Sequence, residues 1–231
     1  MSAEMLAMSE YGRDPRKHHF SPYADNGGTT IAIAGDDFVM VGSDTRLTNY
    51  SGILSRNQTK VFPLTEKTMI ASTGCWADVL SLYKDLQAKL TLYSQEHHDE
   101  MSTPAIAQLV STVLYWRRFF PYYVSNMVIG LDEDGSGVVY HYDPVGHMEK
   151  LRFSSAGASV AQIQPLLDNQ LGALNMKDAV PPKVTKALAH QLMHDAFISA
   201  AERDVKTGDS CIIYTVTKDG VAEEQVKLRR D

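Results

Sequence analysis

A glycine–threonine junction at Gly28-Thr29 is the first place in the sequence where residue types and spacing could do chemistry. Cleavage before a threonine exposes its hydroxyl beside a new α-amino group. That amine can act as the base, because free α-amino groups titrate near pH ~8. The two glycines Gly27 and Gly28 also have a plain structural interpretation, since glycines often lead a loop into a strand of β-branched residues. The junction therefore raises the hypothesis of an N-terminal nucleophile, which the rest of the chain must test.

Composition narrows the classes of function. The 231 residues, 44% of them hydrophobic, are enough for a sizeable core, and a formal net charge of −6 is spread over interspersed acidic and basic residues. No basic run predicts binding to nucleic acid or to an anionic membrane, and neither a secretory signal nor a membrane-spanning stretch is apparent. We therefore expect an intracellular protein with protein or small-molecule partners.

Cysteines and histidines give little support for a metal site. Cys75 and Cys211 are too few for a four-thiolate zinc site or a disulfide framework, and both adjoin apolar residues, so we expect buried thiols. His190 and His194 have the spacing of a zinc-binding helix, but Gln191 stands where a metalloprotease has its glutamate, and no third ligand is evident. We expect no metal ion and no cofactor.

An aromatic run follows two arginines near the middle of the chain. Its members share large, flat side chains and are Phe119, Phe120, Tyr122 and Tyr123, after Arg117 and Arg118. Such a run can stack on nucleic-acid bases, but the acidic balance of the chain argues against that partner. A place in the core or at a subunit interface is favoured.

Hydrophobic periodicity predicts an α+β fold. Alternating apolar residues between turn signals predict strands at 29–34, 38–42, 50–54, 60–64, 68–71, 122–131, 138–142, 150–154, 211–217 and 221–228. A helical period predicts helices over 77–96, from an N-cap at Ser102 through Leu114, over 159–171 and over 184–203. We expect the N-terminal strands to form one sheet and the later strands a second. Two helical pairs then predict a single domain built as a four-layer α-β-β-α sandwich.

Eight segments of the sequence together resemble one protein family. They are Phe20–Tyr23, Asn26–Thr29, Gly42–Arg46, Arg117–Tyr123, Gly130–Gly135, Tyr142–Gly146, Pro165–Gln170 and Ser199–Asp204. In these segments the chain resembles the beta subunits of the eukaryotic proteasome core particle, from Phe20 to its last residue. The resemblance implies the N-terminal-nucleophile hydrolase fold, which agrees with the four layers expected from periodicity.

Active members of that family use an N-terminal threonine supported by an aspartate, a lysine and a serine. The resemblance puts the threonine position at Gly28, and Asp44, Arg46 and Lys60 match the family's residues in type. In the glycine-rich segment of residues 155–158, Ala156 replaces the supporting serine. Two further matching positions are Asp204, which is kept, and Thr207, which stands where a serine is usual. The resemblance therefore implies an inactive site.

The resemblance also implies partners and processing. It predicts a catalytically silent subunit that assembles with other alpha and beta subunits in stacked seven-membered rings, contacts regulatory particles through the complex, and is found in cytoplasm and nucleus. Residues 1–18 are expected to be a leader that is removed, which leaves residues 19–231 as one domain.

Two other functions stay open at this point. Thr29 could serve as the nucleophile after cleavage at Gly28, although a shift of one residue along a strand turns the side chain to the opposite face of the sheet. The chain could instead form a homo-oligomeric scaffold outside any proteasome. A purely structural interpretation is also open for three of these residues, because Asp44, Arg46 and Lys60 could form one buried hydrogen-bonded cluster.

Overall fold

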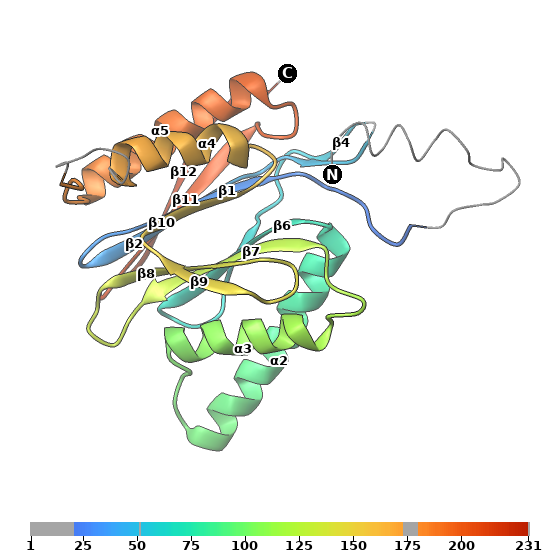
Figure 1. Cartoon of the computed structure of the whole chain (residues 1–231), viewed down its shortest axis with the longest axis vertical. Helices are drawn as coiled ribbons and strands as arrows, with labels where there is room; N and C mark the ends of the chain where they lie inside the picture. The colour runs from blue at the N-terminus through green and yellow to red at the C-terminus, as the bar shows by residue number, and fades with distance from the viewer. Residues whose placement is uncertain (1–20, 51, 173–179, 231) are drawn as a thin grey trace, which may run out of the picture.

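The computed structural model describes residues 21–50, 52–172 and 180–230, so the expected leader, residues 1–18, lies outside the described residues. Two antiparallel sheets stack face to face, and helices cover the outer face of each (Figure 1). This order of helices, sheet, sheet and helices agrees with the α+β arrangement expected from the sequence.

The first sheet has the strand order β10-β1-β2-β11-β12. Its members are β10 (Phe153–Gly157), β1 (Thr29–Ala34), β2 (Phe38–Asp44), β11 (Ser210–Thr217) and β12 (Gly220–Lys227). The second sheet runs β5 (Val61–Pro63), β6 (Thr68–Gly74), β7 (Val124–Leu131), β8 (Gly137–Tyr142) and β9 (Met148–Leu151) in chain order. A separate two-stranded ribbon consists of β3 (Leu47–Thr48) and β4 (Ile53–Ser55).

The strands do not divide between the sheets in the order of the chain, so the expectation of an N-terminal sheet followed by a later sheet is wrong. β1 pairs with β10 as well as with β2, and β2 pairs with β11, while β5 and β6 belong to the second sheet. The strand predicted at 150–154 is in fact the end of β9 and the start of β10, which lie in different sheets. Local alternation predicts that a segment is extended but not which strand it pairs with.

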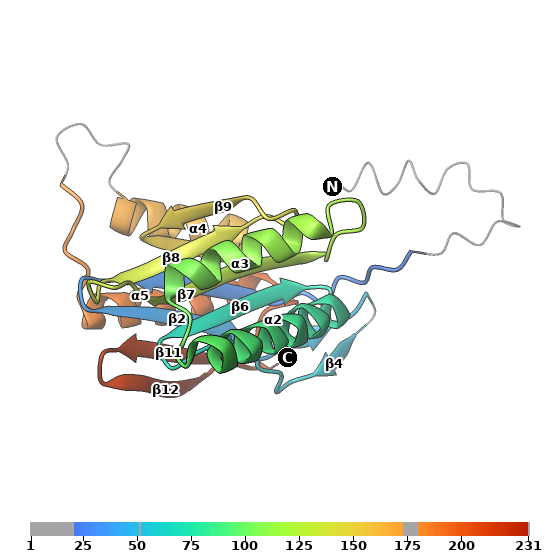
Figure 2. The same cartoon turned by 90° about the horizontal axis from the view of Figure 1, so that it is seen from below.

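Two helices cover each sheet. α2 (Trp76–His97) and α3 (Thr103–Trp116) pack on the second sheet, and α4 (Val160–Leu167) and α5 (Lys186–Arg203) pack on the first (Figures 1 and 2). The predicted helix over 159–171 is α4 followed by one π-helical turn, η1 (Asp168–Gly172). Ser102 is the N-cap of α3 as predicted, but its side chain makes no capping hydrogen bond. No helix in the described ranges is both long and apolar enough to span a membrane.

β1 is buried on both faces and lies at the centre of the molecule. Ile31 and Ile33 point toward the helices of the first sheet, where they join a cluster with Phe197 of α5. Ala32 and Ala34 point the other way, into the cluster between the two sheets. Their small side chains suit the space between two stacked sheets. The residues directly before β1, Asn26 to Gly28, are also buried, so the candidate site lies inside the fold.

Candidate functional site

Gly28 lies just before β1 and faces the space between the two sheets. Its backbone has a φ of 92°, in the region that favours glycine. A Cβ atom built on Gly28 would lie 2.5 Å from Cε and 2.8 Å from Cδ of Lys60, and 3.3 Å from Cγ2 of Thr73. The side chain of Lys60 therefore fills the space that a side chain at position 28 would need. Positions 28 and 60 are therefore neighbours, as the resemblance implies, but position 28 carries no nucleophile.

Lys60 and Asp44 form a buried ion pair beside Gly28. The ammonium of Lys60 donates to the backbone carbonyl of Asp44 at 2.7 Å and to its Oδ1 atom at 3.0 Å, and both side chains are at most 1% exposed. Burial disfavours both charges: it raises the pKa of Asp44 and lowers the pKa of Lys60, while their mutual attraction opposes both shifts. The pair ties the end of β2 to the segment before β5.

Thr29 points away from Lys60, as expected for a neighbour on an extended segment. Its backbone amide donates to Oδ1 of Asp44 at 2.8 Å. Its hydroxyl shares a hydrogen bond of 2.7 Å with the hydroxyl of Thr207 and accepts one of 3.1 Å from the amide of Ser159. Thr29 is fully buried. The hydroxyl therefore takes part in a separate network and has no contact with the Lys60 ammonium.

Asp204 and Thr207 belong to that network, and Ser159 joins them and Thr29 as its fourth member. Oδ2 of Asp204 accepts from the hydroxyls of Ser159 and Thr207, each at 2.7 Å, and the two hydroxyls lie 2.9 Å apart. No signal in the sequence marked Ser159 as a member of this network, because the residue stands at the predicted start of a helix, where a serine usually caps. Here Ser159 is the N-cap of α4 but makes no side-chain cap, because its hydroxyl binds Asp204 instead.

Arg46 does not join Asp44 and Lys60, so the expected cluster of these three residues is wrong. Its Nε atom donates to Oδ2 of Asp209 at 2.8 Å, and the side chain is 3% exposed. Arg56 binds the other oxygen of the same carboxylate. Two buried ionic groups therefore lie side by side in place of one. Asp209, which no motif in the sequence marked, is the centre of the second group.

The Asp209 carboxylate makes the stability of the fold depend on pH. Burial alone would raise the pKa of Asp209, but hydrogen bonds and charges from Arg46 and Arg56 outweigh burial and hold this pKa below its ordinary value. A carboxyl whose folded-state pKa is lowered stabilises the fold fully above its unfolded pKa of ~3.9. That contribution is lost as the pH falls through the lower, folded-state pKa.

We expect Asp209→Asn to lower the free energy of unfolding by about 2 kcal/mol at pH 7, because Arg46 loses a charged partner in a buried place. The difference in the free energy of unfolding between wild type and variant should begin to narrow below pH ~4, where the carboxyl of the unfolded wild-type chain takes up a proton, and should close as the pH falls through the lower, folded-state pKa. Urea unfolding at pH 7 and pH 3 measures both values. Asp219→Asn, in the exposed turn between β11 and β12, is the matched control and should leave the free energy of unfolding unchanged at both pH values. A difference in the free energy of unfolding between wild type and Asp209→Asn that grows as the pH falls would contradict the lowered pKa assigned to Asp209.

Ala156 is not the residue that faces Gly28. In the pairing of β1 with β10, Ala156 lies opposite Thr30, and its side chain is in the core between the sheets. Continued by two residues, this register brings Ala158 opposite Gly28, and the amide of Ala158 donates to the Gly28 carbonyl at 2.8 Å. Ala156 and Ala158 both lack a hydroxyl, so neither could assist proton transfer at position 28.

The segment before Gly28 is held by backbone hydrogen bonds. The amide of Asn26 donates to the Gly74 carbonyl and the amide of Thr48 to the Asn26 carbonyl, each at 3.1 Å, and the amide of Gly74 lies 3.4 Å from the Gly27 carbonyl. The side chain of Asn26 donates to the Thr48 carbonyl and accepts from the amide of Trp76, the first residue of α2. Asn26, Gly27 and Gly28 are buried. This arm is thus integrated into the fold.

A shallow pocket of ≈ 260 Å³ opens beside the arm. Its wall is formed largely by backbone and small side chains from both sheets and from the arm, namely Asp25, Gly27, Thr73, Gly74, Tyr123, Val124, Ser125, Pro144, Gly157 and Ala158. The Gly28 carbonyl beside this pocket already accepts the hydrogen bond of Ala158, and the Gly27 carbonyl faces the amide of Gly74. The pocket therefore adjoins peptide groups that are engaged within the chain.

The two histidines considered for zinc lie on α5. Their rings stack with centroids 6.5 Å apart, and Nε2 of His190 lies 2.9 Å from a carboxylate oxygen of Glu224. His194 lies beside Asp195. Across the described ranges, no group of three or more histidine, cysteine, aspartate or glutamate residues is arranged to hold a metal ion.

Comparisons with known proteins identify the family to which this fold belongs. The family model of the proteasome subunit matches residues 24–216. Proteasome subunit beta type-1 of Drosophila melanogaster is 49% identical over 92% of this chain and 91% of its own length, and that of Danio rerio is 48% identical over 97% and 95%. Proteasome subunit beta type-6 of Saccharomyces cerevisiae is 41% identical over 96% of each chain. Among the beta subunits, the segments Arg117–Tyr123 and Pro165–Gln170 favour the member that is called beta type-1 in some lineages and beta type-6 in others, and these relatives confirm that resemblance. The chain therefore belongs to the proteasome subunit family, among its beta subunits.

Proposed function

We propose that this chain is a catalytically silent, structural beta subunit of the 20S proteasome core particle. It has the four-layer fold of N-terminal-nucleophile hydrolases as a single domain over residues 19–231, and it occupies one place in a seven-membered beta ring stacked with alpha rings. The complex, found in cytoplasm and nucleus, degrades ubiquitinated and unfolded proteins. The observation that carries this proposal is the absence of a side chain at Gly28, whose space is taken by Lys60.

The chemistry of the site supports a silent role. A threonine nucleophile needs a hydroxyl and a free α-amino group, and Gly28 has no hydroxyl. The Lys60 ammonium is bonded to Asp44 and has no hydroxyl to activate. In this proposal, seven residues are the remains of an active site, namely Gly28, Asp44, Arg46, Lys60, Ala156, Asp204 and Thr207. Their charged members now stabilise the fold through buried hydrogen bonds.

The position of the arm supports an uncut Gly27-Gly28 bond. The bond is buried, and residues on either side make backbone hydrogen bonds with Gly74 and Ala158. Further out, the hydroxyl of Tyr23 donates to the Pro121 carbonyl at 2.8 Å, and its ring lies 5.8 Å from that of Phe120. An ordered, packed segment is a poor substrate for proteolysis, which concentrates in unpacked termini. Trimming should therefore stop before the arm.

We expect the mature chain in purified core particles to begin at or near His19, because no group at position 28 can attack the preceding peptide bond, whereas neighbouring active subunits can trim the leader. N-terminal mass analysis of the subunit measures this directly. An active beta subunit in the same particles, which begins at its threonine, is the internal control. A chain that begins at Gly28 or Thr29 would overturn the silent role.

The main alternative, a threonine protease that uses Thr29, requires this hydroxyl to be free and near a base. Its hydrogen bonds to Thr207 and Ser159, and its complete burial, argue against that role. An epoxyketone probe that labelled Thr29 in the core particle would support the alternative. A homo-oligomeric scaffold, the other alternative, would require native complexes with a single type of subunit, which native mass spectrometry distinguishes from a mixed ring.

A further inference from the structure

The segment near the carboxyl terminus is held to the rest of the fold largely by its backbone. The Leu228 amide donates to the Asp209 carbonyl at 3.1 Å, and the Asp209 amide donates to the Arg229 carbonyl at 2.8 Å. The Leu228 side chain lies in the core cluster of the first sheet. Nη1 of Arg56 donates to the Arg230 carbonyl at 2.6 Å. We call Leu228, Arg229 and Arg230 the tail, and its peptide groups carry most of these contacts.

The guanidinium of Arg46 connects the tail to two other elements. Its Nη2 atom donates to the Arg229 carbonyl at 3.3 Å, and its Nε atom donates to Asp209. Its Nη1 atom donates to the Val205 carbonyl at 2.8 Å, in the loop between α5 and β11. The backbone of Arg46 directly precedes β3 of the two-stranded ribbon. Because a guanidinium is planar and presents its donors in a fixed fork, these contacts position the ribbon and the loop relative to each other.

The arm before Gly28 lies between this ribbon and this loop. On the ribbon, the Thr48 amide donates to the Asn26 carbonyl, and the Asn26 side chain donates to the Thr48 carbonyl at 2.9 Å. On the loop, the Lys206 ammonium pairs with the Asp25 carboxylate at 2.5 Å. A Cβ atom built on Gly27 would lie 3.0 Å from Oγ1 of Thr48 and 3.1 Å from Cβ of Lys206. We call residues 25–27 the inner arm.

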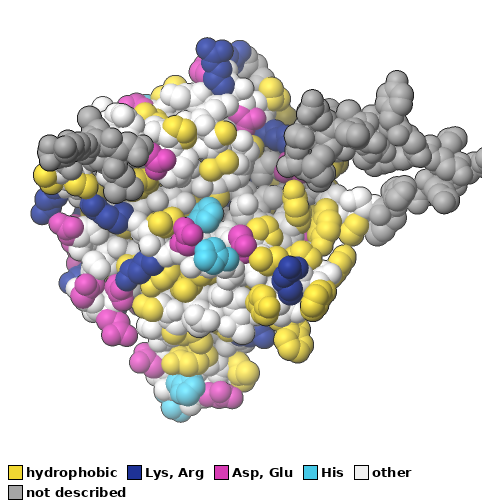
Figure 3. Space-filling view, in the orientation of Figure 1, with side chains coloured by type: hydrophobic (Ala, Val, Ile, Leu, Met, Phe, Trp, Pro, Cys, Tyr) yellow, Lys and Arg dark blue, Asp and Glu magenta, His cyan; other side chains and the backbone are white. Residues whose placement is uncertain are grey.

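The outer end of the arm has a separate anchor. The Tyr23 ring packs against Phe120 and Tyr123, with centroids 5.8 Å and 5.5 Å away. Hydrophobic side chains gather in this part of the molecule, on the right-hand side of Figure 3. These rings belong to the loop after α3 and not to the ribbon or to the loop before β11. The inner arm is therefore the part whose position depends on Arg46.

Both residues that hold the inner arm are next to a contact of Arg46. Thr48 follows Arg46 by two residues. Lys206 directly follows Val205, whose carbonyl accepts from the Arg46 guanidinium. Without the tail, Arg46 would lose the Arg229 carbonyl as an acceptor, and the loss of an acceptor by a buried donor is costly. The ribbon and the loop would then shift to satisfy the guanidinium, and Thr48 and Lys206 would move with them.

We propose that the tail is a latch for the inner arm: through Arg46 it fixes the ribbon and the loop that hold this segment, and it thereby protects the segment from proteolytic trimming. This inference rests on the proposed function, because the active subunits that trim the chain are its neighbours in the core particle. The order of the fold, and not autolysis, then sets where the mature chain begins.

Hydrogen exchange of the inner arm tests the latch. A chain that ends at Lys227 is compared with R229A/R230A, in which the tail keeps its backbone carbonyls. Each variant replaces the wild-type chain in cells, and core particles are purified through a tag on another subunit. We expect the amides of the inner arm and of Thr48 to exchange at least about tenfold faster in the truncated chain, because exchange reports local opening. R229A/R230A should exchange as the wild type does.

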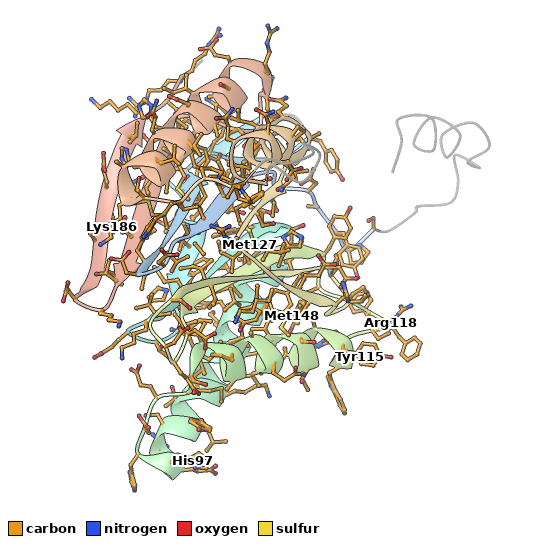
Figure 4. The ribbon with its side chains drawn as sticks, turned by 60° about the vertical axis from the view of Figure 1, so that its left-hand side comes forward. His97, Tyr115, Arg118, Met127, Met148 and Lys186 are labelled. Carbon is orange, nitrogen blue, oxygen red and sulfur yellow. The ribbon has the colours of Figure 1, made fainter. Side chains whose placement is uncertain are left out.

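The amides of β7 are the reference for the fold as a whole. Met127 of this strand is fully buried in the core between the two sheets, and it lies inside the molecule in Figure 4. Exchange in β7 should be the same in all three chains. Unchanged protection of the inner arm in the truncated chain would overturn the latch. Equal acceleration in the inner arm and in β7 would also overturn it, because the tail would then stabilise the whole fold and not the arm.

R46K tests the same connection with the tail intact, and so also covers a truncated chain that fails to assemble. A lysine keeps the charge, but a single ammonium cannot reproduce the fork that serves Asp209, Val205 and Arg229. Exchange of the inner arm should rise several-fold in R46K. It should not rise in R203K, the matched control, since Arg203 is exposed at the end of α5. Equal exchange in these two variants would overturn the part assigned to Arg46.

The amino terminus of the chain in purified particles is a second readout. The truncated chain should begin beyond Tyr23 in a larger share of particles than the wild type, because a loosened segment is a better substrate for proteolysis. Identical amino termini in the two chains would overturn the role of the tail in trimming. The wild-type terminus alone tests the silent role, whereas the difference between the two chains tests the latch, so the two proposals can fail separately.

Discussion

Lys60→Ala should lower the free energy of unfolding by roughly 3–5 kcal/mol while every peptidase activity of the core particle stays near normal. Removal of one partner from a buried ion pair leaves the other charge without compensation, which is the costly case. Here the remaining group is Asp44, fully buried and bonded to Lys60 at 3.0 Å. The substitution also empties the space beside Gly28 that the lysine side chain fills. Urea unfolding of the chain, with peptidase assays and assembly yield of the particle, measures these effects.

Lys150→Ala is the matched control for Lys60→Ala. Its ammonium pairs with Asp132 at a similar distance of 2.8 Å, but the lysine side chain is 55% exposed. Exposed pairs contribute less than about 1 kcal/mol, so this variant should unfold almost as the wild type does. Lys60→Met separates charge from volume, since methionine keeps much of the aliphatic chain. Loss of one peptidase specificity from Lys60→Ala with assembly intact would show that the site is catalytic.

Gly28→Thr, which restores the residue type of an active subunit, should destabilise the chain by roughly 2–6 kcal/mol and produce no new peptidase activity. Part of the cost is backbone strain of about 1–3 kcal/mol, because a φ of 92° is unfavourable for a β-branched residue. The rest is overpacking, of about 1–3 kcal/mol, against the methylene groups of Lys60. Unfolding measurements and epoxyketone labelling of position 28 test the two parts of this expectation.

Gly220→Thr is the control that separates strain from overpacking. Gly220 has a φ of 129°, and a Cβ atom built there meets no atom within 4 Å, so its replacement costs backbone strain alone. The difference between the two variants measures the contact with Lys60. Addition of Ala156→Ser should not rescue activity, because Ala156 lies opposite Thr30 in the core, and Ala158 is the residue that faces Gly28. Efficient labelling of Gly28→Thr by the probe would contradict this geometry.

The sequence by itself determined the local elements of this protein. Alternation over residues 29–34 predicted β1, and the helical spacing of Val79, Leu86 and Leu90 predicted α2, because each depends only on neighbours along the chain. The sequence also determined that position 28 lacks a hydroxyl and that Lys60 and Asp44 are of the types that pair when buried. These facts required no knowledge of which strands lie next to each other.

Only the tertiary structure decided which of these residues meet. Pairing between strands depends on segments distant in the chain, so the return of β10 to β1, and with it the contact of Ala158 with Gly28, had no local signal. Arg46 turned to Asp209 because a buried cation is satisfied by whichever carboxylate the fold brings within reach, and that choice follows from the pairing of β2 with β11. The space beside Gly28 is likewise filled by Lys60 only because close packing leaves few voids in a protein interior.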